Sequence, residues 1–225
     1  SEYQCDRSLT NVIIRLIKGV EMCPQNTVSK DSAQADGQNS SIIIAQAWFI
    51  VGQKKPGGSG KAAALEVLAR YNQPLKGIDI SCRSMGSGYV PSRRRYPCDT
   101  LTQLDDLDLS QTPNLDMSKS NLEGMQGEGI NLSSQDLTLS NLSNSHFPNS
   151  NFSDGLLWSA DLSGSEIPST NFANADLRLA KFNDSNISSS NFSEATMGSA
   201  KLMEVSAFQT KFHNADLSDS NFGLA

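Results

Sequence analysis

The sequence predicts a mainly β solenoid with a small α-helical module at its N-terminal end. Every fifth residue from Leu122 to Phe222 belongs to one series, in which 19 of 21 members are Leu, Ile, Phe or Met. A second series lies two residues earlier, and its 17 members from Ser140 to Ser220 are all Ser, Ala, Thr, Gly or Val. Helices and flat strands do not repeat at five residues, so the chain must turn a corner once per repeat.

Both series are expected to face the interior, because each compensates where the other breaks. Gly127 is small in the large series, and the usually small site before it is Met125. Ala207 is accompanied in the same way by Val205. A close-packed core tolerates such exchanges of volume better than a net change.

Four five-residue sides make up each predicted coil. Every twentieth residue of the large series falls on one line, which is rich in phenylalanine: Leu132, Phe152, Phe172, Phe192 and Phe212. This pattern indicates aromatic rings that stack between neighbouring coils. The 21 repeats then make about five coils. Residues 105–225 are assigned to this solenoid, with Leu107, Leu109, Leu115 and Met117 expected in an irregular first coil around Pro113.

The repeats at 160–164, 175–179 and 215–219 resemble the pentapeptide-repeat family, whose pattern is a small residue, Asp or Asn, Leu or Phe, a polar residue and a variable one. The resemblance implies a right-handed quadrilateral β-helix. Residues 47–48, 58–61, 64–68 and 75–81 are also similar to the segment that leads into the repeats of some bacterial membrane-anchored members. That similarity implies a membrane tether upstream of Ser1.

Residues 1–104 are assigned to a helical, cysteine-containing module. Residues 8–20 have the spacing of an amphipathic helix, and the apolar run at 42–51 predicts a buried helix too short to cross a bilayer. Residues 52–60 form a linker rich in Gly, Lys and Pro, and a further helix is expected at 61–71. The sequence as given shows neither a signal peptide nor a spanning segment.

Charge divides the chain in the same place. Residues 105–225 hold 16 Asp and Glu against 5 Lys and Arg, a net charge of -11, whereas residues 1–104 hold 8 against 13, a net of +5. Direct binding of nucleic acid by the acidic solenoid is therefore not expected, because phosphate binding needs positive charge. A hydrophobic content of 37% and a mean hydropathy of -0.36 indicate a soluble rather than membrane-embedded protein.

The four cysteines, Cys5, Cys23, Cys82 and Cys98, all precede the repeats. They are candidates for two disulfides, and the pairs Cys5–Cys23 and Cys82–Cys98 are the most local of three connectivities. Zinc is a weaker interpretation, because the sequence has no Cys-x-x-Cys pair and its histidines lie in the repeats. Free buried thiols remain a third. Disulfides would place the protein in the periplasm or elsewhere outside the cytoplasm, whereas free thiols would favour a cytoplasmic location.

Other candidate sites are few. Arg93, Arg94 and Arg95 could bind anionic lipid head groups or another polyanion, although such runs more often form solvated loops. Residues 57–61 resemble a phosphate-binding loop, but Lys55 and Ala62 stand where Gly and Ser or Thr are needed. Asp161, Asp176 and Asp216 follow from the repeat itself. No catalytic, cofactor-binding or metal-binding set can be assembled, so no cofactor is expected.

These observations favour a non-catalytic scaffold or protein-binding module, exported and anchored to a membrane. The alternative is a DNA mimic that inhibits or protects DNA gyrase, which the resemblance implies because some family members bind that enzyme, and the net charge of -11 fits it. An enzyme has the least support. The incomplete last coil predicts an end-to-end homodimer or a C-terminal continuation, since an open β edge promotes association.

Overall fold

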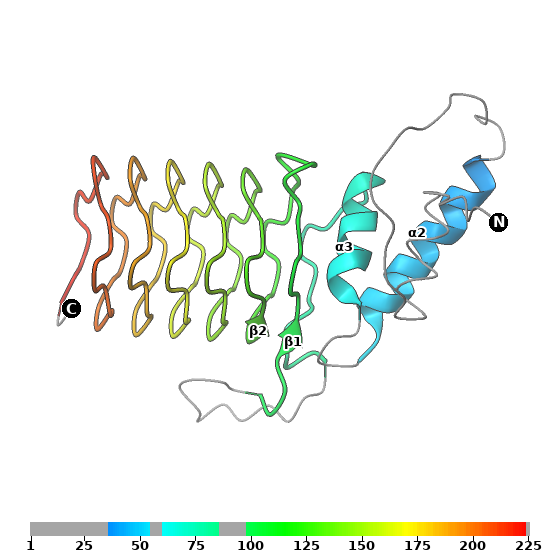
Figure 1. Ribbon diagram of the computed structural model, residues 1–225, viewed down its shortest axis with the longest axis horizontal. Coiled ribbons are helices and arrows are strands. Elements are labelled where there is room, and N and C mark those ends of the chain that lie inside the picture. The colour runs from blue at the N-terminus through cyan, green and yellow to red at the C-terminus, as the bar shows by residue number, and fades with distance from the viewer. Residues whose placement is uncertain (1–35, 55–59, 86–97, 224–225) are drawn as a thin grey trace, which may run out of the picture.

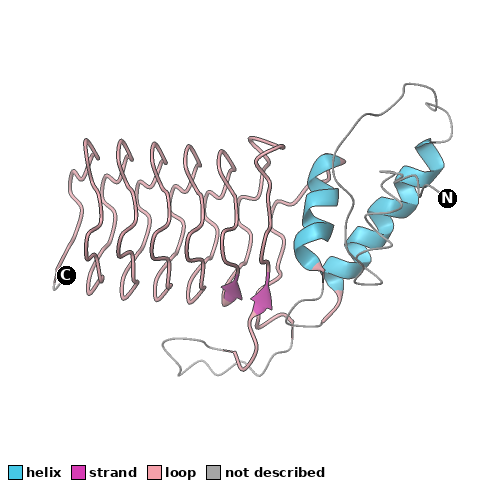
Figure 2. Ribbon diagram, viewed as in Figure 1, coloured by secondary structure: helices cyan, strands magenta, loops and turns pink. Residues whose placement is uncertain are grey.

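The computed structural model describes residues 36–54, 60–85 and 98–223. Helices α2 (Asp36–Gly52) and α3 (Lys61–Arg70) come first, followed by the short strands β1 (Thr102–Gln103) and β2 (Met125–Gln126), which pair in parallel. Figure 1 shows the remaining chain wound into a rod, with α3 against one end, α2 beyond α3, and the C-terminus at the opposite end. Figure 2 draws most of the rod as loop, because each later pairing is a single isolated bridge.

The rod is a β-helical solenoid with four corners in each coil. From Asp116↔Asp136 onward, every parallel bridge joins residues 20 apart, ending with Lys201↔Asn221. A residue in the left-handed conformation recurs every five positions, as at Asn144, Asn149 and Asp154, whose φ angles are 56°, 55° and 58°. These are the five-residue side and the 20-residue register that the sequence predicts.

Both repeating series face the interior, as predicted. The large series is buried as far as Leu202, and the small series is buried from Ser140 to Val205. The predicted aromatic column is confirmed, since Phe172 stacks on Phe152 and Phe192 with ring centroids 5.1 and 4.9 Å away. The volume exchange at Gly127 involves a further residue, because a Cβ there would lie 2.6 Å from Cγ2 of Ile130.

Hydroxyl groups of the small series tie each coil to the one before. Ser145 donates to the carbonyl of Leu122 at 3.0 Å, and Ser165 donates to that of Leu142 at 2.8 Å. Thr170 and Ser190 make the corresponding bonds to Phe147 and Ile167. A small polar residue therefore leaves room for the large side chain and satisfies a buried carbonyl.

The first coil begins before residue 105, inside the segment assigned above to the helical module. Asp79 pairs with Asn121, and β1 pairs with β2, before the bridges at Asp108 and Asp116 complete the four sides. The irregular path around Pro113 is confirmed by the burial of Leu107, Leu109 and Met117.

A buried glutamine repairs the irregular part of this first coil. Gln135 occupies a position that holds a small residue in later coils, and its amide accepts from the N–H of Leu115 and donates to the carbonyl of Leu109, both at 3.1 Å. Its side chain therefore supplies hydrogen bonds that the distorted ladder lacks.

Both described helices were predicted, but their burial was predicted only in part. Leu65 and Leu68 of α3 and Ala47 of α2 are buried in the common core. The expectation that the run 42–51 is buried is wrong on one side of α2, where Ile42 and Phe49 are 55% and 68% exposed. The predicted helix at 8–20 lies outside the described residues. Within the described ranges, neither helix is long and apolar enough to cross a membrane.

The last coil is less covered than the others, because no further coil stacks on it. Ala207, Phe212 and Leu217 are only partly buried, and Phe222 is exposed. These side chains occupy the same lines that are fully buried in the middle of the rod.

Candidate functional site

Cys82 and Cys98 form a disulfide, with Cα atoms 6.1 Å apart and 16 residues between them in sequence. Both residues are buried. The bond closes the excursion that the chain makes between the first side of the first coil, at Asp79, and β1. The N–H of Cys82 also donates to the carbonyl of Glu123 at 3.0 Å, so the bridge is attached to the β ladder. Cys5, Cys23 and Arg93, Arg94 and Arg95 lie outside the described residues.

Replacing Cys82 and Cys98 together by alanine is expected to lower the free energy of unfolding by about 3 kcal/mol, because a closed loop of this length restricts the unfolded chain. The expected consequence is a lower melting temperature, measured by circular dichroism on oxidised wild type and on the double variant. Reduction of the wild type should reproduce the loss, and reduction should leave the melting temperature of the variant unchanged. Equal melting of oxidised wild type and variant would contradict a stabilising role.

Lys61, the end of the loop that resembles a phosphate site, serves the fold instead. Its ammonium is fully buried and donates to the carbonyls of Ile50, Val51 and Gln53 at 2.8 to 3.1 Å. These carbonyls close the C-terminal end of α2, where a cation interacts favourably with the helix dipole. Burial lowers the pKa of Lys61, while the three carbonyl contacts favour its charged form.

A depression of about 370 Å3 lies beside the start of α3, but its charge does not suit phosphate. Three acidic residues line it: Glu66, Asp105 and Asp106. Glu66 accepts from the N–H of Asp108 at 3.0 Å, and burial raises the pKa of this carboxyl. The predicted rejection of a phosphate-binding loop therefore agrees with the contacts that Lys61 makes.

Carboxylates of the repeats cap local turns. Asp161, Asp176 and Asp216 each accept the N–H of the residue two positions later, at 3.0 to 3.3 Å. Burial alone would raise the pKa of Asp161, but hydrogen bonds from Ser163 and Lys181 lower it overall. Across the described ranges, no group of His, Cys, Asp and Glu is placed to hold a metal ion. The repeat explains these acidic residues, as the sequence predicts.

An exposed apolar patch interrupts one side of the rod. This side is defined by its line of bridged residues, Asp116, Asp136, Leu156, Asp176, Thr196 and Asp216, and is called the aspartate side below. The apolar patch consists of Leu139, Leu156, Trp158 and Leu179, whose side chains are 38% to 48% exposed. Leu139 donates its N–H to the carbonyl of Trp158 at 2.9 Å, which places these residues on neighbouring coils. The patch thus extends over three successive coils.

Two members of the patch occupy corners of the solenoid in a backbone conformation that disfavours leucine. Leu139 and Leu179 have φ angles of 60° and 59°, and among the described left-handed residues they are the ones with large apolar side chains. The other corners carry mainly Asn, Ser, Asp and Gly, which tolerate this conformation better. Both leucines are therefore exposed and conformationally unfavourable. Such an outlier points to a function rather than to stability.

This patch was not predicted from the sequence, although its signal was present. Leu139 and Leu179 lie 40 residues apart, which is two coils, on the variable position of their repeats. Once the corner position is known, a leucine there on every second coil stands out from the polar residues of the other corners.

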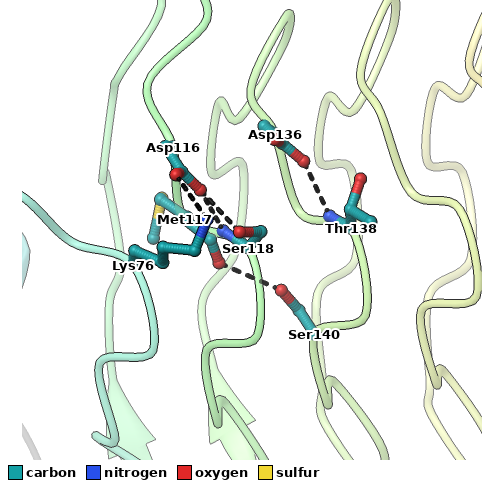
Figure 3. A network of polar contacts seen from close by, with 7 residues as sticks. All are labelled: Lys76, Asp116, Met117, Ser118, Asp136, Thr138 and Ser140. Carbon is teal, nitrogen blue, oxygen red and sulfur yellow. Dashed lines mark hydrogen bonds and ion pairs between the residues drawn. The ribbon is translucent and has the colours of Figure 1, made fainter.

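Negative charge borders the patch. Figure 3 shows Asp116 and Asp136 on neighbouring coils of the aspartate side, where Asp136 accepts the N–H of Thr138 at 2.9 Å. Asp154 lies at the corner just before Leu156. Asp176 accepts two bonds from the guanidinium of Arg178, at 2.8 and 2.6 Å, and these bonds lower the pKa of its carboxyl. Ionised carboxylates therefore lie beside exposed leucine and tryptophan.

The double variant Leu139→Asn/Leu179→Asn is expected to leave the melting temperature unchanged or to raise it by a few degrees. Asparagine removes a left-handed penalty of about 1 kcal/mol per leucine, and the partial burial lost at each site offsets some of that gain. A matched control is Ser169→Leu, which introduces an exposed leucine at the opposite edge, where φ is 56°, and should lower the melting temperature slightly. Calorimetry checks both. A loss above about 2 kcal/mol in the double variant would assign the two leucines to the fold instead.

Similar folds occur among solved structures. One is a pentapeptide repeat protein from the thylakoid lumen of Arabidopsis thaliana, at 19% identity and a TM-score of 0.34, with 40% of this chain and 66% of that chain covered. Rfr23 of the cyanobacterium Cyanothece has 17% identity, a TM-score of 0.32, and coverage of 53% and 87%. QnrB1, a plasmid-mediated fluoroquinolone resistance protein, has 18% identity, a TM-score of 0.30, and coverage of 55% and 61%. This chain therefore spans less than two thirds of the first and third of these proteins.

Sequence comparison gives a family match within the solenoid. No curated protein sequence matches the chain. Residues 156–194 match the family model described as pentapeptide repeats, in 8 copies. The matched residues lie in the regular part of the rod, where a large buried residue recurs at every fifth position and bridges join residues 20 apart. The solenoid of this chain therefore belongs to the pentapeptide-repeat family.

Proposed function

We propose that the protein is a non-catalytic scaffold that binds another protein through the apolar patch. The observation that carries this proposal is the exposed cluster of Leu139, Leu156, Trp158 and Leu179 on a side of the rod that otherwise presents Asp, Thr and Ser. Large apolar side chains surrounded by polar groups resemble the centre of a protein interface, where tryptophan is frequent. The hydrogen-bonded coils beneath hold these side chains in fixed positions, so little ordering is needed on binding.

Export and membrane anchoring are part of the same proposal. The Cys82–Cys98 disulfide supports a location outside the cytoplasm, because structural disulfides persist in oxidising compartments. Anchoring rests on the sequence similarity around residues 58–81 described above. Fractionation of the native cells, with alkylation of thiols before lysis, tests both: an oxidised pair in the cytoplasmic fraction, or free thiols in any fraction, would contradict export.

The DNA-mimic alternative rests on the acidic solenoid, whose net charge is -11. A gyrase supercoiling assay with excess protein tests it. Inhibition, or protection of gyrase from a quinolone, that depends on acidic residues of the rod would favour this alternative over the scaffold.

Site-directed photo-crosslinking tests the scaffold directly. A photoreactive phenylalanine at Thr138, which lies beside Trp158 on the neighbouring coil, should crosslink a partner in the native cells. Mass spectrometry then identifies the partner, and the purified pair is compared with variants. Binding should be lost with Leu139→Asn/Leu179→Asn and retained with Ser169→Leu. A partner that binds all three proteins equally, or no crosslinked partner at all, would contradict binding through the patch.

A further inference from the structure

We propose that the element bound at the apolar patch is an amphipathic helix of a partner protein, lying along the rod and carrying Lys or Arg on one flank. This inference rests on the proposed function and specifies its partner. It follows from the hydrogen bonding of the side, the spacing of the apolar residues and the charge beside them.

Backbone groups on this side of the rod are already paired. The N–H groups of Leu156 and Asp176 donate to Gln135 and Gly155, and those of Leu139 and Leu179 donate to Trp158 and Gly198, at 2.9 to 3.0 Å. A partner strand therefore finds no free ladder to extend here. Recognition must use side chains, which is how an amphipathic helix binds, through residues at i, i+3 or i+4, and i+7.

The spacing of the patch fits the rise of a helix. Neighbouring coils are about 5 Å apart, so Leu139 and Leu179, two coils apart, are separated by about 10 Å along the rod. Leu156 and Trp158 lie on the coil between them. A helix parallel to the rod places residues i, i+4 and i+7 at about 0, 6 and 10.5 Å along its axis. Each of three helical residues can therefore meet one coil of the patch.

The charges fix the second feature of the partner. Asp136 and Asp176 lie on either side of Leu156 in the line of bridges, and Asp154 occupies the adjoining corner. Lys181, the nearest cation beyond the Leu139–Leu179 edge, is engaged with Asp161 at 2.9 Å. The flank of a docked helix that faces the aspartate side therefore meets negative charge. Basic side chains on that flank complement it, whereas acidic ones are repelled.

Three synthetic helical peptides of about 18 residues test the proposal. The first carries Leu at i, i+4 and i+7 with Lys on one flank; the second replaces each Lys by Glu; the third keeps the Lys composition but scatters the Leu. The protein carries Trp48→Phe, which leaves Trp158 as its reporter, since the chain holds 2 tryptophans. We expect the first peptide to shift Trp158 emission to the blue on binding, and the other two to bind at least tenfold more weakly.

Variants of the protein distinguish specific binding from attraction to an acidic rod. Leu139→Asn/Leu179→Asn should weaken the first peptide roughly tenfold, as expected for the loss of two apolar contacts. Asp136→Asn/Asp154→Asn should weaken it about threefold and reduce the effect of salt. Ser169→Leu should leave the affinity unchanged.

Several outcomes would overturn the proposal. Equal binding of the Lys and Glu peptides rules out the basic flank, and equal binding of the scattered peptide rules out the helical stripe. Dimerisation of the protein that is abolished by Leu139→Asn/Leu179→Asn, seen by analytical ultracentrifugation, would make a second copy of this chain the occupant. If no peptide binds while the crosslinked partner still depends on the patch, the helix is wrong and the proposed function stands; if both fail, the proposed function fails too.

Discussion

Deleting residues 161–165 should destabilise the solenoid more than deleting residues 161–180, although the shorter deletion removes a quarter as many residues. The reason is register. Each bridge joins residues 20 apart, so a 20-residue deletion replaces one coil by the next and every later side keeps its line. Phe192 then stacks on Phe152 in place of Phe172. The longer deletion should therefore melt in one cooperative transition a few degrees below wild type, as expected when a solenoid loses one unit.

The five-residue deletion rotates everything after it by one side. The stacked contact between Phe152 and Phe172, at 5.1 Å, is lost, and so is the bond from the amide of Asn171 to that of Asn151, at 3.1 Å. Hydroxyls such as that of Ser190 no longer face their carbonyls 23 residues earlier. Together these losses should cost on the order of 3 to 5 kcal/mol beyond any loss in the longer deletion.

Melting curves of the two deletion proteins, followed by circular dichroism and by calorimetry, measure the difference. Deletion of residues 171–190 is the matched control, because it is also in register and should behave like the first long deletion. Equal melting temperatures for the short and long deletions would contradict a coil of 20 residues as the unit of stability.

The regular part of this fold was predictable because one period determines both burial and pairing. Residues such as Phe172 and Ser190 declare their inward direction by spacing alone, and the 20-residue line of phenylalanines gives the register. Small inward residues could be assigned as well. Their hydrogen bonds to the preceding coil could not, because these depend on the offset of 23 residues that the coil geometry creates.

The start of the solenoid was harder to predict, because its contacts skip a long stretch of sequence. Asp79 pairs with Asn121, 42 residues later, with the Cys82–Cys98 bridge in the intervening excursion. No period reveals such a pairing. Gln135 was likewise unexpected, since its value lies in the two bonds it makes to the irregular coil around Pro113.

The candidate site was missed for a different physical reason. A leucine at the variable position of a repeat is unremarkable until that position is known to be a left-handed corner, as at Leu139 and Leu179. Exposure had to be known too, because leucine in a five-residue repeat is normally an inward residue. Only the combination of corner, exposure and adjacency to Trp158 identifies a binding surface.

Replacing Phe172 by alanine should lower the free energy of unfolding by about 4 kcal/mol, the usual cost of removing a fully buried phenylalanine. Phe172 is 0% exposed and lies between two stacked rings, with Phe182 in an edge contact at 5.9 Å. Coils above and below are held apart by their own bridges, so the cavity cannot close by a local collapse. Chemical denaturation of wild type and variant measures the change.

Phe212→Ala is the matched control, because Phe212 belongs to the same aromatic column but lies in the last coil. It stacks on one ring of that column, Phe192 at 5.3 Å, and is only partly buried. Its removal should therefore cost about 1 to 2 kcal/mol. A similar loss for both variants would mean that stacking on each side contributes little, and that hydrogen bonding between coils, rather than the aromatic column, determines the stability of the rod.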